Sequence, residues 1–121
     1  MHELSIAVEL VDLASAELAR LGEVRVTALH LRLGPLAGVV EDALLFSFDV
    51  AAAGTPIEGA RLVIEREEVR AWCAGCAQPR TLVSMHERRC PECGVATPQL
   101  VSGDSLELTA LEVLDHAGPD R

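Results

Sequence analysis

The sequence predicts an α+β fold, in which a three-stranded sheet carries two helices on one face and a zinc-ribbon-like module is inserted before the last strand. Three observations favour this fold. Two segments with helical spacing alternate with two strand-like segments over residues 1–69. All four cysteines follow in two closely spaced pairs, and a third strand-like segment comes after them. Half of the 121 residues are apolar, which is enough for one compact core and an added module.

Both helices are expected from the spacing of their apolar residues. The first covers residues 4–21 and ends at Gly22. The stripe predicted to face the core comprises Leu4, Val8, Val11, Ser15 and Leu18, with Ala7 and Ala14 beside it. The second helix runs from about Glu41 to Ala53, because its acidic start suits the positive end of the helix dipole. Its stripe comprises Leu44, Leu45, Phe48 and Ala52.

Three segments read as strands, over residues 24–33, 61–69 and 105–114. In the first, alternation predicts one face with Leu29, Leu31 and Leu33, and an opposite face begun by Val24, Val26 and Ala28. We expect residues 1–69 and 102–115 to form one discontinuous domain and residues 70–101 to form the second. The hinges would lie at Val69–Arg70 and at Val101–Gly103, and residues 116–121 would be a flexible tail.

The cysteines have the spacing of a closed metal site. Cys73 and Cys76 form one pair and Cys90 and Cys93 the other, with two residues inside each pair and thirteen between them. Four thiolates from two tight turns favour a structural zinc site, since no coordination position is left for water. Gly75 and Gly94 suit such turns because glycine tolerates positive φ. Two disulfides fit this spacing poorly, and a single redox pair would leave the second pair unexplained.

The chain carries a formal net charge of −9, which makes nucleic-acid binding unfavourable. One Trp, two Phe and no Tyr provide no platform for stacking bases. We expect no membrane span and no signal peptide, and with free thiols this favours a cytoplasmic protein. No activated nucleophile, phosphate-binding loop or acid/base pair is recognisable, so an enzyme is not expected.

His2 lies beside the chain's amino terminus. The Met1 amine, the His2 amide and the His2 imidazole lie within chelating reach of one ion, and Glu3 adds another amide and a carboxylate. Planar nitrogen ligation selects Ni(II) or Cu(II). From the local sequence alone, a frayed chain start with a stray histidine is the simpler interpretation.

The whole chain resembles the HypA/HybF family of hydrogenase nickel-incorporation proteins. The opening Met-His-Glu-Leu-Ser, the stretch Leu33–Val39, the run Phe46–Asp49, the two cysteine pairs and the Gly103-Asp104-Ser105-Leu106 start of the last strand carry the resemblance. It implies a nickel metallochaperone, not an enzyme, with an α/β nickel-binding domain and an inserted zinc domain.

The resemblance also implies the site residues and partners. His2, the Met1 amine and the Glu3 amide would hold nickel as cargo, and Cys73, Cys76, Cys90 and Cys93 would hold structural zinc. The partners would be a HypB-type GTPase and the large subunit of nickel-iron hydrogenase, with urease as a further recipient, and the chain would be a monomer or weak homodimer. Two other hypotheses remain: a zinc-ribbon adaptor without a nickel role, and a zinc-free thiol oxidoreductase.

Overall fold

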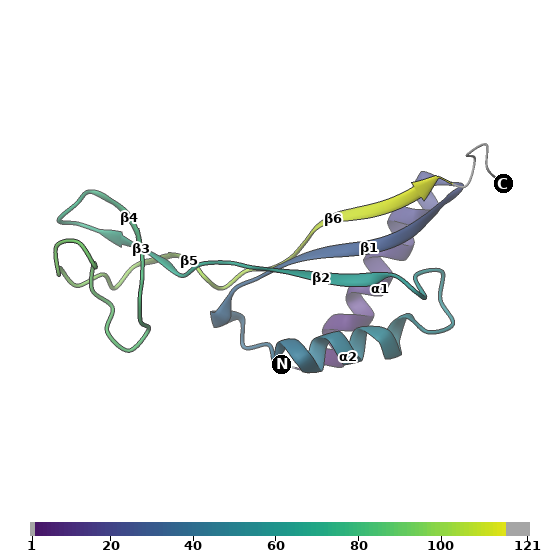
Figure 1. Ribbon diagram of the computed structural model, residues 1–121, viewed down its shortest axis with the longest axis horizontal. Coiled ribbons are helices and arrows are strands. Elements are labelled where there is room, and N and C mark those ends of the chain that lie inside the picture. The colour runs from purple at the N-terminus through teal and green to yellow at the C-terminus, as the bar shows by residue number, and fades with distance from the viewer. Residues whose placement is uncertain (1, 116–121) are drawn as a thin grey trace. The chain divides into compact units, whose positions relative to one another are not determined.

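The computed structural model describes residues 2–115; Met1 and residues 116–121, on which the predicted flexible tail falls, lie outside the described part. The elements in chain order are α1 (Glu3–Leu21), β1 (Val24–Leu33), the 3-10 helix η1 (Pro35–Ala37), α2 (Glu41–Ala52), β2 (Arg61–Arg66), β3 (Arg70–Cys73), β4 (Gln78–Thr81), β5 (Leu100–Ser102) and β6 (Leu106–Asp115) (Figure 1). They confirm the predicted α+β class. Two helices and two strands, β1 and β2, precede the cysteine-containing module, and β6 follows it and completes a three-stranded sheet with them. Within residues 2–115, no helix is long and apolar enough to cross a membrane.

The chain folds into two compact units. Of the described residues, the helical unit consists of 2–31, 38–65 and 107–115, and the cysteine unit consists of Arg32–Ala37 and Arg66–Leu106. The first contains most of a sheet with strand order β2-β1-β6, and the second a sheet with order β4-β3-β5. The predicted domain borders at 69/70 and 101/102 remain a prediction about which parts fold independently.

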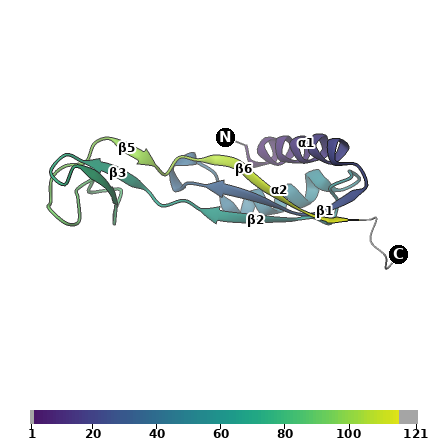
Figure 2. The ribbon, with the colours of Figure 1, turned by 90° about the horizontal axis from the view of Figure 1, so that it is seen from above.

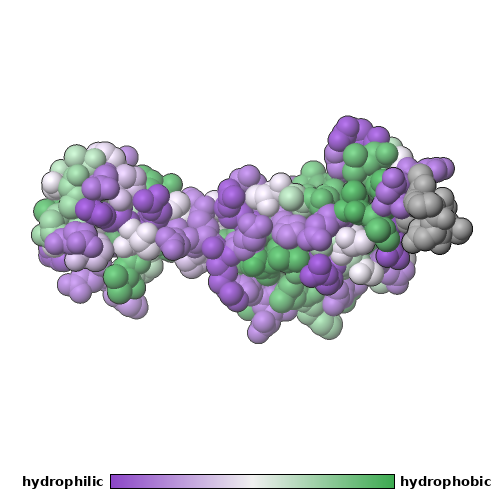
Figure 3. Space-filling view, turned by 45° about the horizontal axis from the view of Figure 1, so that its top comes forward, coloured by the Kyte–Doolittle hydropathy of each residue, from purple (hydrophilic) through white to green (hydrophobic). Residues whose placement is uncertain are grey.

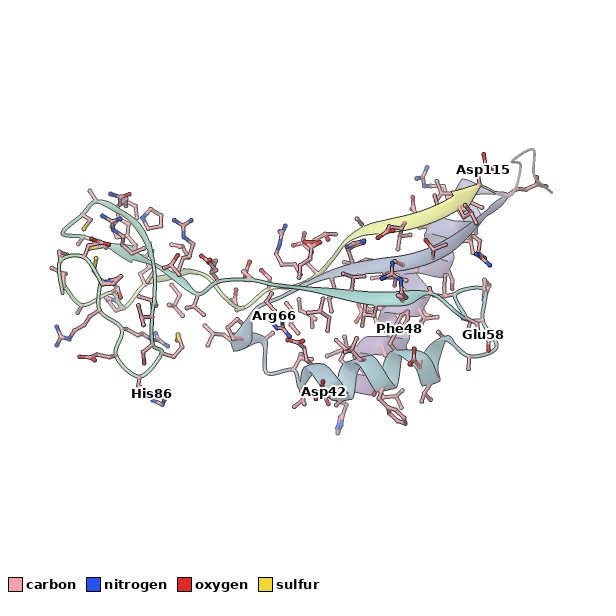
Figure 4. The ribbon with its side chains drawn as sticks, in the orientation of Figure 1. Asp42, Phe48, Glu58, Arg66, His86 and Asp115 are labelled. Atoms are coloured by element: carbon pink, nitrogen blue, oxygen red, sulfur yellow. The ribbon has the colours of Figure 1, made fainter. Side chains whose placement is uncertain are left out.

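The core of the helical unit lies between the two helices and one face of its sheet. Figures 1 and 2 show α1 and α2 on the same side of β1, β2 and β6. Phe48, 1% exposed, lies between α2 and the sheet (Figure 4). Leu44 and Ala52 are buried on the same face of α2, as their spacing predicted, whereas Leu45, also placed in that stripe, is 38% exposed, because it lies beside the sector of the helix that the core covers. This burial of an apolar face is the main source of the unit's stability.

The buried face of α1 differs from the predicted stripe. The buried residues of this helix are Ile6, Ala7, Leu10, Val11 and Ala14. Of the predicted stripe, Val11 alone is buried, whereas Leu4 and Val8 are 49% and 46% exposed. The sector of α1 with apolar side chains is wider than the sector that the sheet and α2 cover. More than one row of apolar residues could therefore be buried. Packing against α2 and the sheet buries the row that contains the small residues Ala7 and Ala14.

Burial along β1 does not follow a simple alternation. Val26 and Ala28 are buried, and so are Leu29, Leu31 and Leu33. Both predicted sets are thus covered by neighbouring parts of the molecule, as suits the central strand of the sheet. The expectation that the two sets face opposite sides of the sheet stays a prediction.

The second predicted strand ends three residues earlier than expected. After Arg66, the residue Glu67 forms hydrogen bonds with Leu33, Gly103 and Ser105. β2 ends at Arg66, and the Glu67 amide donates to the Leu33 carbonyl at 2.9 Å. The Glu67 carboxylate then accepts from the Gly103 amide at 2.7 Å and from the Ser105 hydroxyl at 2.7 Å. Gly34 has no room for a side chain here, since a Cβ would lie 2.1 Å from the Gly103 carbonyl oxygen. The predicted hinge at Val101–Gly103 thus adjoins a closely bonded segment of the cysteine unit.

Candidate metal sites

The four cysteine sulfurs converge at one point of the cysteine unit. Their Sγ atoms all lie within 4.8 Å of one another. The distance from Cys73 Sγ to Cys93 Sγ is 3.4 Å, and from Cys76 Sγ to Cys90 Sγ it is 3.8 Å. Four sulfurs at about 2.3 Å from a tetrahedral zinc ion would be about 3.8 Å apart. None of the four is in a disulfide. The arrangement has the size of a four-cysteine metal site.

Two tight turns hold the sulfurs in place with backbone amides. The Cys76 amide donates to Cys73 Sγ at 3.3 Å. The amides of Glu92 and Cys93 donate to Cys90 Sγ at 3.3 Å and 3.4 Å. Donors of this kind stabilise thiolates and fix their direction, as partners of metal ligands do. The two turns belong to β3 and its continuation and to the loop before β5, so residues far apart in sequence supply one site.

Glycine is needed in these turns for two different reasons. Gly94, directly after Cys93, has φ of 77°, which favours glycine. The equivalent position after Cys76 is Ala77, which has φ of 55°. Gly75 does not have positive φ, contrary to the expectation. Space favours glycine there instead, because a Cβ would lie 3.1 Å from Cys93 Sγ and 3.1 Å from a Val95 methyl group, which is tighter than ordinary contact.

The pKa values of two of the cysteine thiols are shifted in opposite directions. Burial raises the pKa of the Cys90 thiol, but the amides of Cys93 and Glu92 favour the thiolate and bring the pKa down to about 6. The Val95 amide lowers the pKa of Cys93, whereas hydrogen bonds shared with the other thiols, first that of Cys73, raise it to about 12. Four thiolates this close repel one another unless a cation lies among them. The donor set therefore suits a divalent soft metal such as zinc.

A cationic side chain approaches the cluster from β4. A hydrogen bond with the Cys76 sulfur raises the pKa of the Arg80 guanidinium, and the charges of Cys76 and Cys90 act in the same direction. A zinc ion with four thiolates is a dianion, which one arginine partly neutralises. The sequence places four arginines within residues 70–100. The register of β3 and β4, which places Ala71 opposite Arg80, selects this one.

The predicted nickel ligands lie at the start of α1. His2 is the residue before the first helical turn, has extended backbone angles (φ −87°, ψ 122°) and is exposed. Helical hydrogen bonding begins with the Ser5 and Ile6 amides, which both donate to the His2 carbonyl. The Glu3 carboxylate accepts from the Val40 amide at 2.9 Å, and this bond lowers the pKa of Glu3. Met1, the third predicted nickel-binding residue, lies outside the described residues.

The other described histidines do not join either site. His86 lies on the outer loop of the cysteine unit and is exposed (Figure 4). His30 is on β1, with its Nε2 2.5 Å from a Glu112 carboxylate oxygen and its Nδ1 3.4 Å from one of Glu65. The two carboxylates face different ring nitrogens, so the group forms a cross-strand bridge. The sequence could not indicate this cluster, because its members come from three separate strands.

Comparison with known proteins gives the same family as the sequence. A family model described as "Hydrogenase/urease nickel incorporation, metallochaperone, hypA" matches residues 1–113. The chain belongs to this family. A "Hydrogenase maturation factor HypA" of Roseiflexus sp. (strain RS-1) is 52% identical over 115 residues, covering 95% of this chain and 94% of that protein. One from Chloroflexus aurantiacus (strain ATCC 29366 / DSM 635 / J-10-fl) is 51% identical over 112 residues, covering 93% and 98%. The family consists of maturation factors and metallochaperones, not enzymes.

Two solved structures of the family share the fold. "Solution structure of HypA protein" has a TM-score of 0.71 at 19% identity, covering 94% of this chain and 97% of that one. "Solution structure of the Ni metallochaperone HypA from Helicobacter pylori" has a TM-score of 0.64 at 20% identity, covering 95% and 99%. The similarity extends over nearly the whole of each chain, which confirms the predicted α+β fold.

Proposed function

We propose that this chain is a nickel carrier, which binds Ni(II) at its N-terminus and delivers it for the maturation of nickel-iron hydrogenase, with urease as a further recipient. A HypB-type GTPase and the hydrogenase large subunit are the proposed partners within the hydrogenase maturation machinery. The four cysteines hold a structural zinc ion. Residues 1–69 and 102–115 form the nickel-binding domain, and residues 70–101 form the zinc domain.

The observation that supports the nickel site is the position of His2 directly before an α-helix. The first amides of a helix have no carbonyl partner inside the helix, and here helical pairing starts at Ser5. A metal can therefore take the deprotonated amides of His2 and Glu3 without breaking a helical hydrogen bond. With the Met1 amine and the His2 imidazole, these amides make a planar set of four nitrogens, which suits Ni(II).

The contact of Glu3 with Val40 supports a role for the Glu3 amide rather than its carboxylate. The carboxylate is occupied by the Val40 amide, which belongs to the residue before α2. A nickel ion bound by backbone nitrogens leaves this contact in place. Zinc in the four-cysteine site has no open position and would supply rigidity to the cysteine unit, not chemistry.

Delivery is tested in cells that make a nickel-iron hydrogenase but lack their own copy of this carrier. The intact chain is expected to restore hydrogenase activity at low nickel, and the His2→Ala variant is expected to fail at equal protein level. Excess nickel in the medium should restore activity to the variant, because a lost carrier is replaced by mass action. A His2→Ala variant that matures the hydrogenase as well as the intact chain would overturn the proposal.

A further inference from the structure

The outer face of α2 is apolar although the core covers only the opposite face. Leu44, Phe48 and Ala52 are buried on the inner side. On the other side, Phe46 is 71%, Val50 is 53% and Leu45 is 38% exposed. A helix that is apolar all round is ordinarily buried all round. Phe46 and Val50 lie next to each other on this outer side because they are four residues apart, which is about one turn of the helix.

Acidic residues border these apolar side chains. Asp42 lies one turn before Phe46 in the same row, and the exposed Asp49 adjoins Val50. In Figure 4, Asp42 lies at the start of α2. Counted together, α1 and α2 contain seven acidic residues against Arg20, a balance of −6. That arginine is paired with Glu17 on α1 itself. The helices thus carry most of the chain's net charge of −9.

We propose that the outer face of α2, defined by Asp42, Leu45, Phe46, Asp49 and Val50, binds a partner protein through an amphipathic helix with basic and apolar rows. Figure 3 shows hydrophobic surface exposed beside hydrophilic surface on the part of the molecule that contains the helices and sheet. An exposed aromatic ring among smaller apolar groups is the usual anchor of such a contact. Rows at a spacing of four residues fit a helix better than an extended segment.

Charge selects a basic partner over a second copy of this chain. Two copies joined through α2 would bring two acidic helices together, which costs free energy at low salt. A partner with lysine or arginine beside its apolar row would instead meet Asp42 and Asp49. The inference goes beyond the proposed nickel function, because no residue of the outer face of α2 is a proposed metal ligand.

The test uses the zinc-loaded full chain and an 18-residue helical peptide, with an apolar row of leucine and a polar row of lysine, as the probe. Binding is measured by calorimetry with the intact chain and with the Phe46→Ser/Val50→Ser variant. Both residues are exposed, so the variant is expected to fold, which circular dichroism checks. The expected result is binding that the variant weakens about tenfold or more, in line with the loss of an interface anchor.

Matched controls distinguish peptide binding at the outer face of α2 from non-specific binding to other exposed apolar residues and from any effect of the nickel site. Val83→Ser, at a residue 88% exposed in the cysteine unit, and Leu13→Ser, at a residue 51% exposed on α1, should leave the peptide affinity unchanged. Asp42→Asn/Asp49→Asn should weaken binding at an ionic strength of about 0.05 M and have less effect at about 0.5 M. His2→Ala should bind the peptide normally, so failure of the nickel proposal remains a separate result.

Three outcomes would overturn the inference. The first is peptide binding that Phe46→Ser/Val50→Ser does not weaken, or no binding at all. The second is equal binding of a peptide with glutamate in place of lysine. The third is a concentration-dependent dimer in sedimentation that the same double variant abolishes, because a second copy would then be the occupant of this face.

Discussion

The Glu3 carboxylate accepts a hydrogen bond from the Val40 amide at 2.9 Å, and this contact joins the start of α1 to the start of α2. The residue that follows His2 is thus fixed through its side chain, while its backbone nitrogen stays at the unpaired end of the helix. The two roles of Glu3 can be separated by substitution, because one belongs to the side chain and the other to the main chain.

Glu3→Pro removes the backbone amide that the nickel site requires. Proline is well accepted at the first position of a helix, and the extended conformation of His2 suits a residue before proline. The helix is therefore expected to persist, while the planar nickel spectrum is lost, as absorption during nickel titration would record.

Glu3→Ala is the matched control, since it removes the same carboxylate and keeps the amide. It should bind one equivalent of nickel with the planar spectrum of the intact chain. If Glu3→Pro kept that spectrum, the amide would not be a ligand; if Glu3→Ala lost it, the carboxylate would be one.

Removal of one buried sulfur should unfold the cysteine unit. Cys73 is fully buried, and a Cys73→Ala chain would have three thiolates for a site built for four. We expect loss of the single zinc equivalent and of ordered structure in this unit. Fluorescence of Trp72, its neighbour and the only tryptophan, reports the change. Zinc content would be measured on the same samples, and one equivalent retained with unchanged fluorescence would contradict the assignment.

Two phenylalanines on α2 should respond differently to truncation. Phe48 is 1% exposed, so Phe48→Ala should lower the free energy of unfolding by about 3–5 kcal/mol. Phe46 is 71% exposed, so Phe46→Ala should change it by less than about 0.5 kcal/mol. Urea unfolding followed by circular dichroism measures both. Equal losses would mean that the two faces of α2 are packed alike.

The Glu67 contacts make part of the stability depend on pH. The Ser105 hydroxyl and the amides of Gly103 and Ser105 hold the pKa of Glu67 below its ordinary value of 4.5. A lowered folded pKa contributes stability that is present above about pH 4.5 and is lost as the pH falls through the folded pKa.

Glu67→Gln should therefore be less stable than the intact chain at neutral pH, and this difference in unfolding free energy should shrink below about pH 4.5. Zinc content is measured at each pH, and the two chains are compared only over the range in which both keep their zinc, because the Glu67 contacts lie in the cysteine unit. Glu107→Gln, at an exposed position of β6, is the control and should show no such trend. A difference that stays constant down to about pH 3 would show that the charge of Glu67 has no part in its contacts.

The sequence was sufficient for features set by local spacing. The two cysteine pairs predicted the metal cluster because each pair lies within one turn. The helices and the two long strands followed from their periodicity. The sequence did not predict which stripe of α1 is buried, since Leu4, Val8 and Ile6 are all strongly apolar and only the packing of α2 and the sheet decides between them.

Features that depend on distant segments were also missed. The early end of β2 is set by Leu33, Gly103 and Ser105, whose proximity no local pattern reveals. The short sheet of β3, β4 and β5 was not predicted, because its strands have three or four residues. The sequence also could not show which arginine near the cysteines acts on the cluster, whereas the structure places Arg80 on β4 opposite Ala71, where the Cys76 sulfur raises its pKa.

The central claim is tested most directly by titrating nickel into zinc-loaded protein that begins with its native Met1, beside the His2→Ala variant. Absorption of planar Ni(II) is followed in both. One equivalent bound by the intact chain, and lost with His2, is the result that the account predicts. Equal binding by both chains, or binding by neither, would contradict an N-terminal nickel site.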